Sequence, residues 1–230
     1  MDRIVIYTCI VGSYDDLLQP MHVEEGMDYI CFVGKGEAHP EKDGVWTIRE
    51  LPFSLGDSTL DARYPKMHPH ELLPEYDCSV WIDANVLVKD GTLGRCARIK
   101  AAAGVKYSGV PHPSRDCVYE EAKKCRDMKY ISWGKLFRIW AFLFLHRFPR
   151  HAGLMENNLI FRRHNDQDII AFDEFWWSMV VDFCRRDQIS HGYCMRKFGI
   201  RPDWLLGRGQ NTRNNPGFEY RLHKKKQCLK

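Results

Sequence analysis

The sequence predicts an α/β protein. Short runs rich in β-branched and aromatic residues suit strands buried in a sheet, and they lie at residues 3–11, 28–33, 45–49, 79–82 and 158–162. Residues 169–183 instead repeat their apolar side chains with the spacing of a helix face. At 230 residues, 44% of them hydrophobic and 13% aromatic, the chain is long enough to bury one sizeable core. We therefore expect a single domain covering residues 1–230.

Charge and cysteine content narrow the class of protein. A net charge of +4 and a pI near 8.5 favour an anionic ligand or surface without requiring nucleic acid, so we expect no nucleic-acid partner. The nine cysteines are odd in number and include no Cys-x-x-Cys pair, which is typical of reduced thiols and not of a zinc or disulfide framework. The chain opens with an apolar strand instead of a basic region followed by a signal segment, so we expect a cytoplasmic protein.

The first strand breaks at Gly12, where a tight turn would let a ligand approach the backbone. In an open α/β sheet the loop after this strand lies at the carboxyl edge, where ligands bind. Tyr14 in this loop is a candidate to stack on a base, and a plain strand-to-helix turn explains the same residues equally well. The second strand is closed by Gly34-Lys35-Gly36, which lacks the full spacing of a P-loop.

Residues 61–74 precede the central strand and carry two cations. Arg63 and Lys66 are three apart, so on a helical turn they share a face directed at the edge of the sheet. An arginine fork and a lysine point charge beside a carboxylate-bound metal suit a diphosphate, although solvated surface charges would need no explanation. Prolines 65, 69 and 74 interrupt any long helix and favour a loop around a ligand.

Polar side chains follow directly on the central strand, 79–82. Asp83 and Asn85 are separated by one small residue, and residues i and i+2 of an extended chain point the same way. Their oxygens would then converge as a hard divalent cation requires, with phosphate oxygens completing the shell. Asp and Asn are also ordinary turn residues, so a strand ending in an Asx turn is the alternative.

The next segments offer candidates for substrate binding and for a surface contact. After a predicted helix at 89–104, His112 and Arg115 lie in a loop ahead of a helix that begins near Cys117, and a helix N-terminus attracts anions. A plain surface position is the alternative for His112. The lipophilic run 136–148 is too short, and too interrupted by arginine and histidine, to cross a bilayer. We expect a buried or partner-facing helix there, with peripheral contact to a membrane surface as the alternative.

Three further features lie in the second half of the chain. Glu156 and Asn157, on the approach to the strand at 158–162, are candidates to hydrogen-bond sugar hydroxyls, with a polar loop as the alternative. Asp187 either caps a helix or presents a carboxylate to a reacting carbon. Residues 208–230 are rich in asparagine, glycine and basic side chains, and this composition predicts a mobile basic tail.

Seven pieces, spread in one consistent order over nearly the whole chain, are typical of a known family. They are Ile6-Tyr-Thr-Cys-Ile-Val-Gly-Ser-Tyr14, Asp28-Tyr-Ile-Cys-Phe32, Ala62-Arg63 with Lys66, Trp81-Ile-Asp-Ala-Asn-Val86, Cys117-Val-Tyr-Glu-Glu-Ala122, Gly153-Leu-Met-Glu-Asn-Asn158 and Arg186-Asp-Gln188. The chain resembles the GT-A-type nucleotide-sugar glycosyltransferases. More closely, it resembles a short glycosyltransferase-like family, long described as a domain of unknown function, found in bacterial surface-polysaccharide loci and in plants.

The resemblance implies a GT-A-like nucleotide-binding α/β/α sandwich with a mixed, mostly parallel central sheet. It implies a nucleotide-binding half at 1–105, a half for the acceptor and donor sugar at 106–222, and a basic tail at 223–230. The donor would be a nucleotide-diphosphate sugar and the acceptor a saccharide or glycan. The implied role is surface polysaccharide biosynthesis, in the cytoplasm or at the inner face of the membrane.

The resemblance also implies which residues form the site. Asp83 and Asn85 stand at the family's Asp-x-Asp metal motif, and His223 would be the third protein ligand of Mn²⁺ or Mg²⁺. Asn85 replaces a carboxylate with a neutral oxygen, which weakens the expected metal affinity. The residues expected around the nucleotide are Thr8, Tyr14, Arg63, Lys66 and Asp83. Those expected to contact the substrate are His112, Arg115, Glu156 and Asn157.

Glycosyl transfer develops positive charge at the sugar carbon and negative charge on the departing diphosphate. The metal, Lys66 and the cluster beginning at Lys224 would stabilise the diphosphate. If the reaction inverts configuration, Asp187 is the candidate base. If it retains configuration, Asp187 and Gln188 would hold the donor sugar or stabilise the cationic carbon. The alternative functions are a metal-dependent hydrolase that uses the same site and a non-catalytic carbohydrate-binding module.

Overall fold

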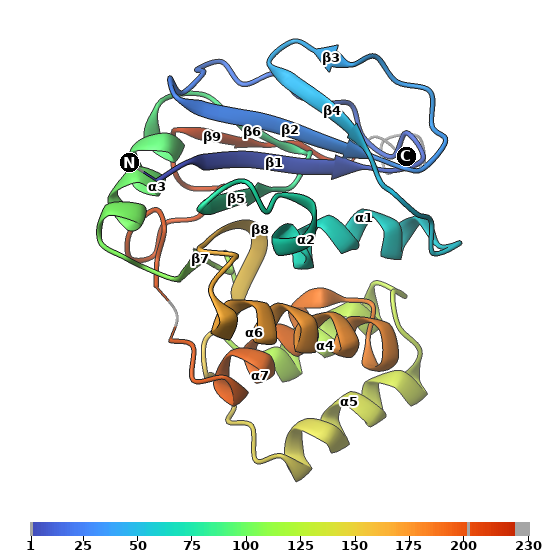
Figure 1. The fold of residues 1–230 in the computed structure, drawn as a ribbon. Coiled ribbons are helices and arrows are strands. Elements are labelled where there is room, and N and C mark those ends of the chain that lie inside the picture. The colour runs from blue at the N-terminus through green and yellow to red at the C-terminus, as the bar shows by residue number, and fades with distance from the viewer. Residues whose placement is uncertain (1, 202, 224–230) are drawn as a thin grey trace.

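A seven-stranded mixed sheet forms the centre of the computed structural model, which describes residues 2–201 and 203–223 (Figure 1). Its strands lie in the order β3 (Lys42–Asp43), β4 (Trp46–Glu50), β2 (Met27–Val33), β1 (Ile4–Ile10), β5 (Cys78–Ile82), β8 (Met155–Arg162) and β7 (Tyr107–Pro111). β4, β2, β1 and β5 run parallel, β3 is antiparallel to β4, and β8 is antiparallel to both β5 and β7. The predicted α/β class with a mixed, mostly parallel sheet is confirmed.

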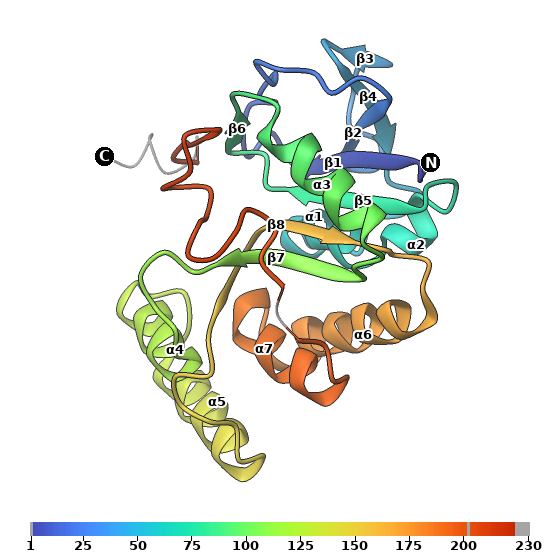
Figure 2. The same ribbon diagram turned by 90° about the vertical axis from the view of Figure 1, so that its left-hand side faces the viewer.

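Both faces of the sheet are covered, which gives three layers (Figures 1 and 2). One face packs against α1 (Ser58–Met67), α2 (Pro69–Leu72), α6 (Gln167–Ser178) and α7 (Asp187–Lys197). The other packs against α3 (Thr92–Ala102) and a small antiparallel sheet of β6 (Val86–Val88) and β9 (Phe218–Tyr220). The alternation of side chains along a strand explains the sorting, because Ile4 and Ile6 of β1 join the α3 side whereas Val5 and Tyr7 join the α6 side.

A third cluster of buried side chains lies further from the sheet. It joins α4 (Val118–Asp127) and α5 (Trp133–Leu145) to a short π-helical turn, η1 (Met179–Phe183), that continues α6. These helices, together with α3, α6 and α7, correspond to the helices that the sequence predicts. Within the described ranges, none of the helices has the length and apolar character needed to cross a bilayer.

The prediction of a mobile tail from residue 208 onward is wrong for the first part of that segment. Phe218–Tyr220 pairs with Val86–Val88 as β9, far away in the sequence. Thr212 is buried, and its hydroxyl accepts a hydrogen bond from Asn158 Nδ2 at 2.7 Å. A local composition cannot reveal a strand whose partner lies in the first half of the chain. The predicted lysine cluster from Lys224 onward falls outside the described residues.

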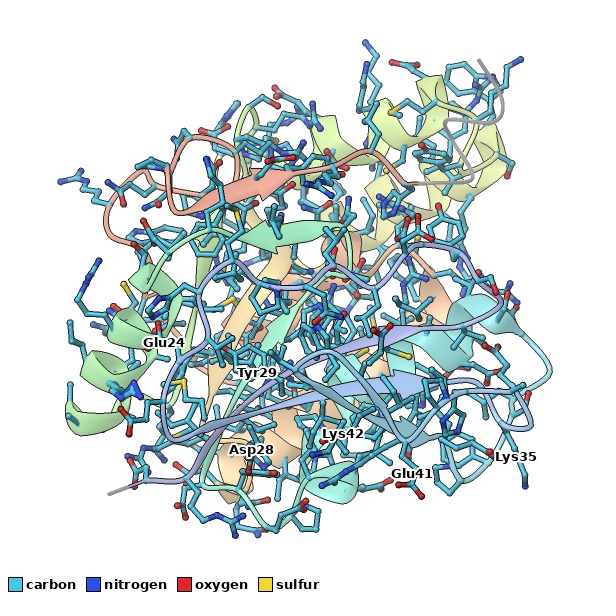
Figure 3. The ribbon with its side chains drawn as sticks, turned by 90° about the horizontal axis from the view of Figure 1, so that it is seen from above. Glu24, Asp28, Tyr29, Lys35, Glu41 and Lys42 are labelled. Atoms are coloured by element: carbon cyan, nitrogen blue, oxygen red, sulfur yellow. The ribbon has the colours of Figure 1, made fainter. Side chains whose placement is uncertain are left out.

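The loop between β1 and β2 is fixed against α3 by Glu24 (Figure 3). The backbone N–H of Glu24 donates to the Tyr29 hydroxyl at 3.0 Å, and Arg98 Nη1 of α3 lies 3.5 Å from Glu24 Oε2. A Cβ added to Gly94 would lie 2.0 Å from Cδ of Glu24, so a side chain at this position of α3 would displace the Glu24 side chain. The same loop carries Tyr14 toward the carboxyl edge of the sheet.

His164 makes the stability of this fold depend on pH. Its fully buried ring donates from Nε2 to the Leu73 carbonyl oxygen at 3.0 Å, while Nδ1 has no hydrogen-bond partner in the part of the chain that the structure describes. Burial lowers the pKa of His164 to about 4, below the ~6.5 of an unfolded chain. As the pH falls below that value, the unfolded chain binds the proton first, and stability is lost down to the folded pKa.

We therefore expect His164→Gln, which keeps a side-chain donor but cannot titrate, to remove about 2 kcal/mol of the stability loss between about pH 7.5 and about pH 5. Urea unfolding at the two pH values measures this difference. His151→Gln is the matched control. Because His151 is exposed and its hydrogen bond with Asp116 raises its pKa, this substitution should not reduce the loss of stability between the two pH values. An unchanged pH dependence in His164→Gln would contradict the prediction.

Candidate functional site

A cleft of about 960 Å³ lies at the carboxyl edge of the sheet, where ligands bind in α/β folds. The ends of β1 and β5 and the start of the antiparallel β8 meet at this edge, and α1 forms one wall. The opposite wall comes from the end of α4, the start of α5 and the segment that leads into α7. The lining thus combines segments from the whole length of the chain.

All but two of the predicted site residues line this cleft. Those in the lining are Tyr14, Arg63, Lys66, Asp83, His112, Arg115, Glu156, Asn157, Asp187, Gln188 and His223. Thr8 does not: it is 1% exposed and lies further inside β1 than Ile10, which is on the same side of the sheet and does line the cleft. Direct contact between the Thr8 side chain and a nucleotide in the cleft is therefore not supported.

Residues 83–85 form a turn instead of an extended segment. Val86 N–H donates to the Asp83 carbonyl oxygen at 2.9 Å, which closes the turn between β5 and β6. Asp83 faces the cleft, whereas Asn85 is buried and donates from Nδ2 to the Arg221 carbonyl oxygen at 2.7 Å. The extended geometry behind the predicted convergence of the two side chains does not hold here. The turn alternative describes the backbone, and Asn85 anchors the C-terminal segment beside the cleft.

Lys66 lies between two carboxylates at the base of the cleft. Its Nζ is 2.9 Å from Asp187 Oδ2 and 3.4 Å from Asp83 Oδ1, and its side chain is only 7% exposed. Trp81 Nε1 donates to the same Asp83 oxygen at 2.7 Å, so Asp83 is held from two sides. Arg63 and Lys66 share one face of α1, as their spacing predicts, because the segment is helical despite Pro65.

A buried ion pair fixes the backbone below Lys66. Arg162, at the end of β8, donates from Nη2 to the Lys66 carbonyl oxygen at 2.5 Å and from Nη1 to both oxygens of Asp173 in α6 at 2.7 Å. Both partners of this pair are completely buried. Because a buried guanidinium with several partners has little freedom, it holds α1 and hence the Lys66 ammonium in place.

The surroundings of Asp187 favour a charge role over proton transfer. Burial alone would raise the pKa of this carboxyl, but the charges of Lys66, Arg63 and Arg186 outweigh burial and hold the pKa well below its ordinary value. A general base works best when its pKa lies near the working pH. Asp187 therefore suits the stabilisation of positive charge better than the removal of a proton. Asp187 is the first residue of α7 and follows the cap position, which Arg186 occupies.

The start of β8 brings polar atoms without partners into the cleft. Glu156 Oε2, Asn157 Nδ2 and Asn158 Oδ1 are buried and make no hydrogen bond to any residue described here. Buried polar atoms are nearly always paired in folded proteins, so such a group calls for a missing partner. A carboxylate and two amides that line one cleft match the donors and acceptors of sugar hydroxyls.

His112 and Arg115 are held by their own loop. His112 Nδ1 accepts hydrogen bonds from the backbone N–H groups of Ser114 and Arg115, at 3.2 and 3.0 Å. Arg115 Nε donates to Glu121 Oε2 at 2.5 Å. Burial, followed by the charge of Arg115, lowers the pKa of His112 to about 4, so the ring is neutral at pH 7. Both side chains reach the cleft, but part of their bonding capacity is used within the loop.

The last described residue meets the loop after β1. His223 Nδ1 lies 2.7 Å from Asp15 Oδ2, and the His223 ring is 5.0 Å from the ring of Tyr14. The C-terminal segment thus closes one side of the cleft, next to the turn at Asp83. His223 lines the same cleft as Asp83, and the Asp15 carboxylate already contacts the His223 ring.

The family model described as "TOD1/MUCI70, glycosyltransferase-like domain" matches residues 1–213. The chain belongs to this family. The glycosyltransferase-like family inferred from the sequence pieces is therefore confirmed. A probable hexosyltransferase MUCI70 from Arabidopsis thaliana is 22% identical over 228 residues, a match that covers 88% of this chain and 39% of that protein. The chain thus spans about two fifths of the length of this relative.

Two solved glycosyltransferase structures are also similar to this member of the TOD1/MUCI70 family. One is the apo form of the bifunctional glycosyltransferase WbbM, with a TM-score of 0.47 and 11% identity over 88% of this chain and 38% of that one. The other is the apo form of mouse xyloside xylosyltransferase 1, with a TM-score of 0.47 and 10% identity over 88% of this chain and 84% of that one.

Arg213 is a cleft residue that the sequence did not single out. Its Nη2 donates to Glu156 Oε1 at 2.6 Å, and its guanidinium lies 3.6 Å from the centre of the Tyr220 ring. It stands in an irregular, asparagine-rich stretch that has no helical or strand periodicity, so no local pattern could mark it. The other charged lining residues missed in the sequence are Asp15, Glu121, Lys124, Lys135, Arg185 and Arg186.

Proposed function

We propose that this chain is a nucleotide-sugar-dependent glycosyltransferase, which moves a sugar from a nucleoside diphosphate to a saccharide acceptor with the help of Mn²⁺ or Mg²⁺. Membership of a glycosyltransferase-like family supports the transferase class. The observation that carries the choice of donor is the Lys66 ammonium, buried between Asp83 and Asp187 in a cleft with a basic lining. A fixed cation at this point can stabilise a departing diphosphate without reorganising during the reaction.

The charge of the cleft supports an anionic donor. Lysines and arginines outnumber acidic residues in the lining: Arg63, Lys66, Arg115, Lys124, Lys135, Arg185, Arg186 and Arg213 against Asp15, Asp83, Glu121, Glu156 and Asp187. Glu121 and Glu156 already have arginine partners, Arg115 and Arg213. The remaining positive charge favours an anionic ligand, and a diphosphate offers several oxygens to arginine forks.

The donor set beside the turn fits a hard divalent cation. Asn85 Oδ1 is a buried carbonyl oxygen that has no hydrogen-bond partner among residues 2–201 and 203–223, and Asp83 offers a carboxylate that is 33% exposed. Carboxylate and amide oxygens are the ligands that Mg²⁺ and Mn²⁺ take. Asp83, Asn85 and His223 would hold the ion. When bound, it would neutralise negative charge on the diphosphate.

Three side chains of the cleft would then have separate roles in the transfer. The acceptor hydroxyl oxygen forms a bond to the anomeric carbon as the bond from that carbon to the diphosphate breaks, and the electron pair leaves with the diphosphate. Asp187 stabilises the positive charge at the carbon, and Lys66 stabilises the leaving group. Glu156 accepts the hydroxyl proton, because burial raises the pKa of its carboxyl and makes it a stronger base than Asp187.

Calorimetric titration of UDP and GDP, with Mn²⁺ and with EDTA, tests the proposal. We expect one nucleotide to bind more tightly with Mn²⁺, and its sugar conjugate to turn over only when a saccharide acceptor is present. Release of free sugar without any acceptor would instead indicate a metal-dependent hydrolase. A carbohydrate-binding module would respond to glycans and ignore both the nucleotides and the metal.

A further inference from the structure

The outer face of α5 is apolar and exposed. Trp133, Phe137, Phe144 and Leu145, here called the α5 stripe, are 53, 58, 76 and 75% exposed. Trp133, Phe137 and Phe144 recur with helical spacing on one side of α5, Leu145 lies on the neighbouring exposed side, and the buried Leu136, Ile139 and Leu143 lie on a different side. Figures 1 and 2 both show α5 at the edge of the molecule, away from the sheet. A surface helix normally turns polar side chains outward, so this face marks a contact with a partner.

Positive charge gathers around the same helix. Residues 123–150 contain one acidic residue, Asp127, and eight basic ones: Lys123, Lys124, Arg126, Lys129, Lys135, Arg138, Arg147 and Arg150. The whole chain carries a net charge of only +4, so the rest of the chain has more acidic than basic residues. Arg138 on α5 and Arg147 just after it are exposed. The basic excess of the protein is therefore concentrated beside its exposed apolar strip.

We propose that the α5 stripe docks on a membrane surface that contains anionic phospholipids. The aromatic and leucine side chains would enter the headgroup region, and the surrounding lysines and arginines would contact lipid phosphates. A second copy of the chain is a poorer occupant, because pairing the two stripes would bring two clusters of like charge together. An anionic lipid surface can bury the apolar side chains of the α5 stripe and also neutralise the positive charge around it.

The position of the stripe also indicates the class of acceptor, an inference that rests on the proposed function. The wall of the cleft includes Met128 and Tyr130, which are 47 and 41% exposed, and continues through Lys135 into α5. The stripe therefore begins at the rim of the cleft, and docking through it would bring that rim to the lipid surface. A saccharide carried on a membrane lipid would reach the cleft from there. We infer that the acceptor is such a lipid-linked saccharide.

Vesicle flotation tests the docking without any nucleotide or acceptor. We expect the full chain to float with vesicles of mixed phosphatidylcholine and phosphatidylglycerol, to float less with phosphatidylcholine alone, and to dissociate as salt increases. Phe144→Ser with Leu145→Ser should lower partitioning at least about tenfold. Ile99→Ser is the matched control, since Ile99 is 58% exposed on α3 and should leave flotation unchanged. Charge reversal by Arg138→Glu with Arg147→Glu should abolish the preference for anionic vesicles.

Two flotation results would overturn the proposal. One is an absence of flotation with anionic vesicles, and the other is equal loss in the Ile99 control and the stripe variant. Sedimentation that reveals a dimer abolished by the stripe variant would assign the face to self-association instead. Nucleotide titration separates these results from the enzymatic proposal, because the stripe lies outside the cleft lining and its variants should bind nucleotide as the wild type does. Given docking, faster transfer to a lipid-anchored than to a soluble saccharide supports the acceptor class, and equal rates overturn it.

Discussion

Replacing Asp187 with asparagine is expected to lower kcat for sugar transfer by about 10²–10³-fold, while nucleotide affinity stays the same or rises. The substitution keeps the shape of the side chain and removes its charge. The carbon that gains positive charge in the transition state then loses its anionic partner. Lys66, which lies 2.9 Å from Asp187 Oδ2, loses this counter-charge, keeps Asp83, and so attracts the diphosphate more strongly. Single-turnover kinetics and calorimetry with the diphosphate measure the two effects separately.

Asp168→Asn provides a matched control for this substitution. Asp168 also lies 2.9 Å from a lysine nitrogen, that of Lys106, but both side chains are exposed and neither lines the cleft. Its loss should leave transfer unchanged, because an exposed ion pair contributes little to stability. Full transfer by Asp187→Asn would remove Asp187 from the mechanism. Loss of nucleotide binding together with transfer would indicate a structural role instead.

The pH profile separates a charge role for Asp187 from a role as base. Because its pKa lies well below the ordinary value, Asp187 stays ionised over the whole range in which the protein is assayed. Any fall of kcat toward acidic pH must then come from another group, and the raised pKa of Glu156 makes it the candidate. The residual activity of Asp187→Asn should keep the acidic limb of the wild type. Loss of that limb would identify Asp187 as the base.

The strands that sequence reasoning found are those with an uninterrupted apolar signal. Ile4–Ile10 and Cys78–Ile82 lie in the middle of the sheet, and burial on both faces gives them a continuous run of apolar residues. Tyr107–Pro111 was missed because it is an edge strand with glycine and proline and a bulge after Gly109. β9 was missed because its three residues become a strand only through pairing with β6.

The candidate site divides in the same way. Arg63 and Lys66 could be placed together because helix geometry alone fixes their common face. Thr8 and Asn85 could not be placed, since the access of Thr8 to the cleft depends on where β1 ends and the position of Asn85 depends on one hydrogen bond of a turn. Arg213 had no local signal at all, because its partner Glu156 lies in another element. Sequence patterns therefore predicted the neighbourhood of the site better than its individual contacts.

Asp83→Ala is expected to abolish the effect of Mn²⁺ on nucleotide affinity, a loss of at least about 100-fold if the cation contributes several kcal/mol. In EDTA the substitution should not weaken nucleotide binding, because removing a carboxylate beside Lys66 relieves repulsion of the diphosphate. The nucleotide affinity of Asp83→Ala should then equal or exceed that of the wild type. Calorimetry with Mn²⁺ and with EDTA measures both changes in nucleotide affinity. A simple loss of folding would weaken binding in both conditions.

Asp83→Asn shows which property of the side chain matters. An amide oxygen can still accept the hydrogen bond from Trp81 Nε1, so the buried indole keeps its partner and the stability cost of Asp83→Ala, about 1–2 kcal/mol, is avoided. With Asn85 also neutral, the turn would then offer the cation no carboxylate. We therefore expect Asp83→Asn to lose the Mn²⁺ response as fully as Asp83→Ala while unfolding at the same urea concentration as the wild type. A retained response in both variants would move the cation away from the end of β5.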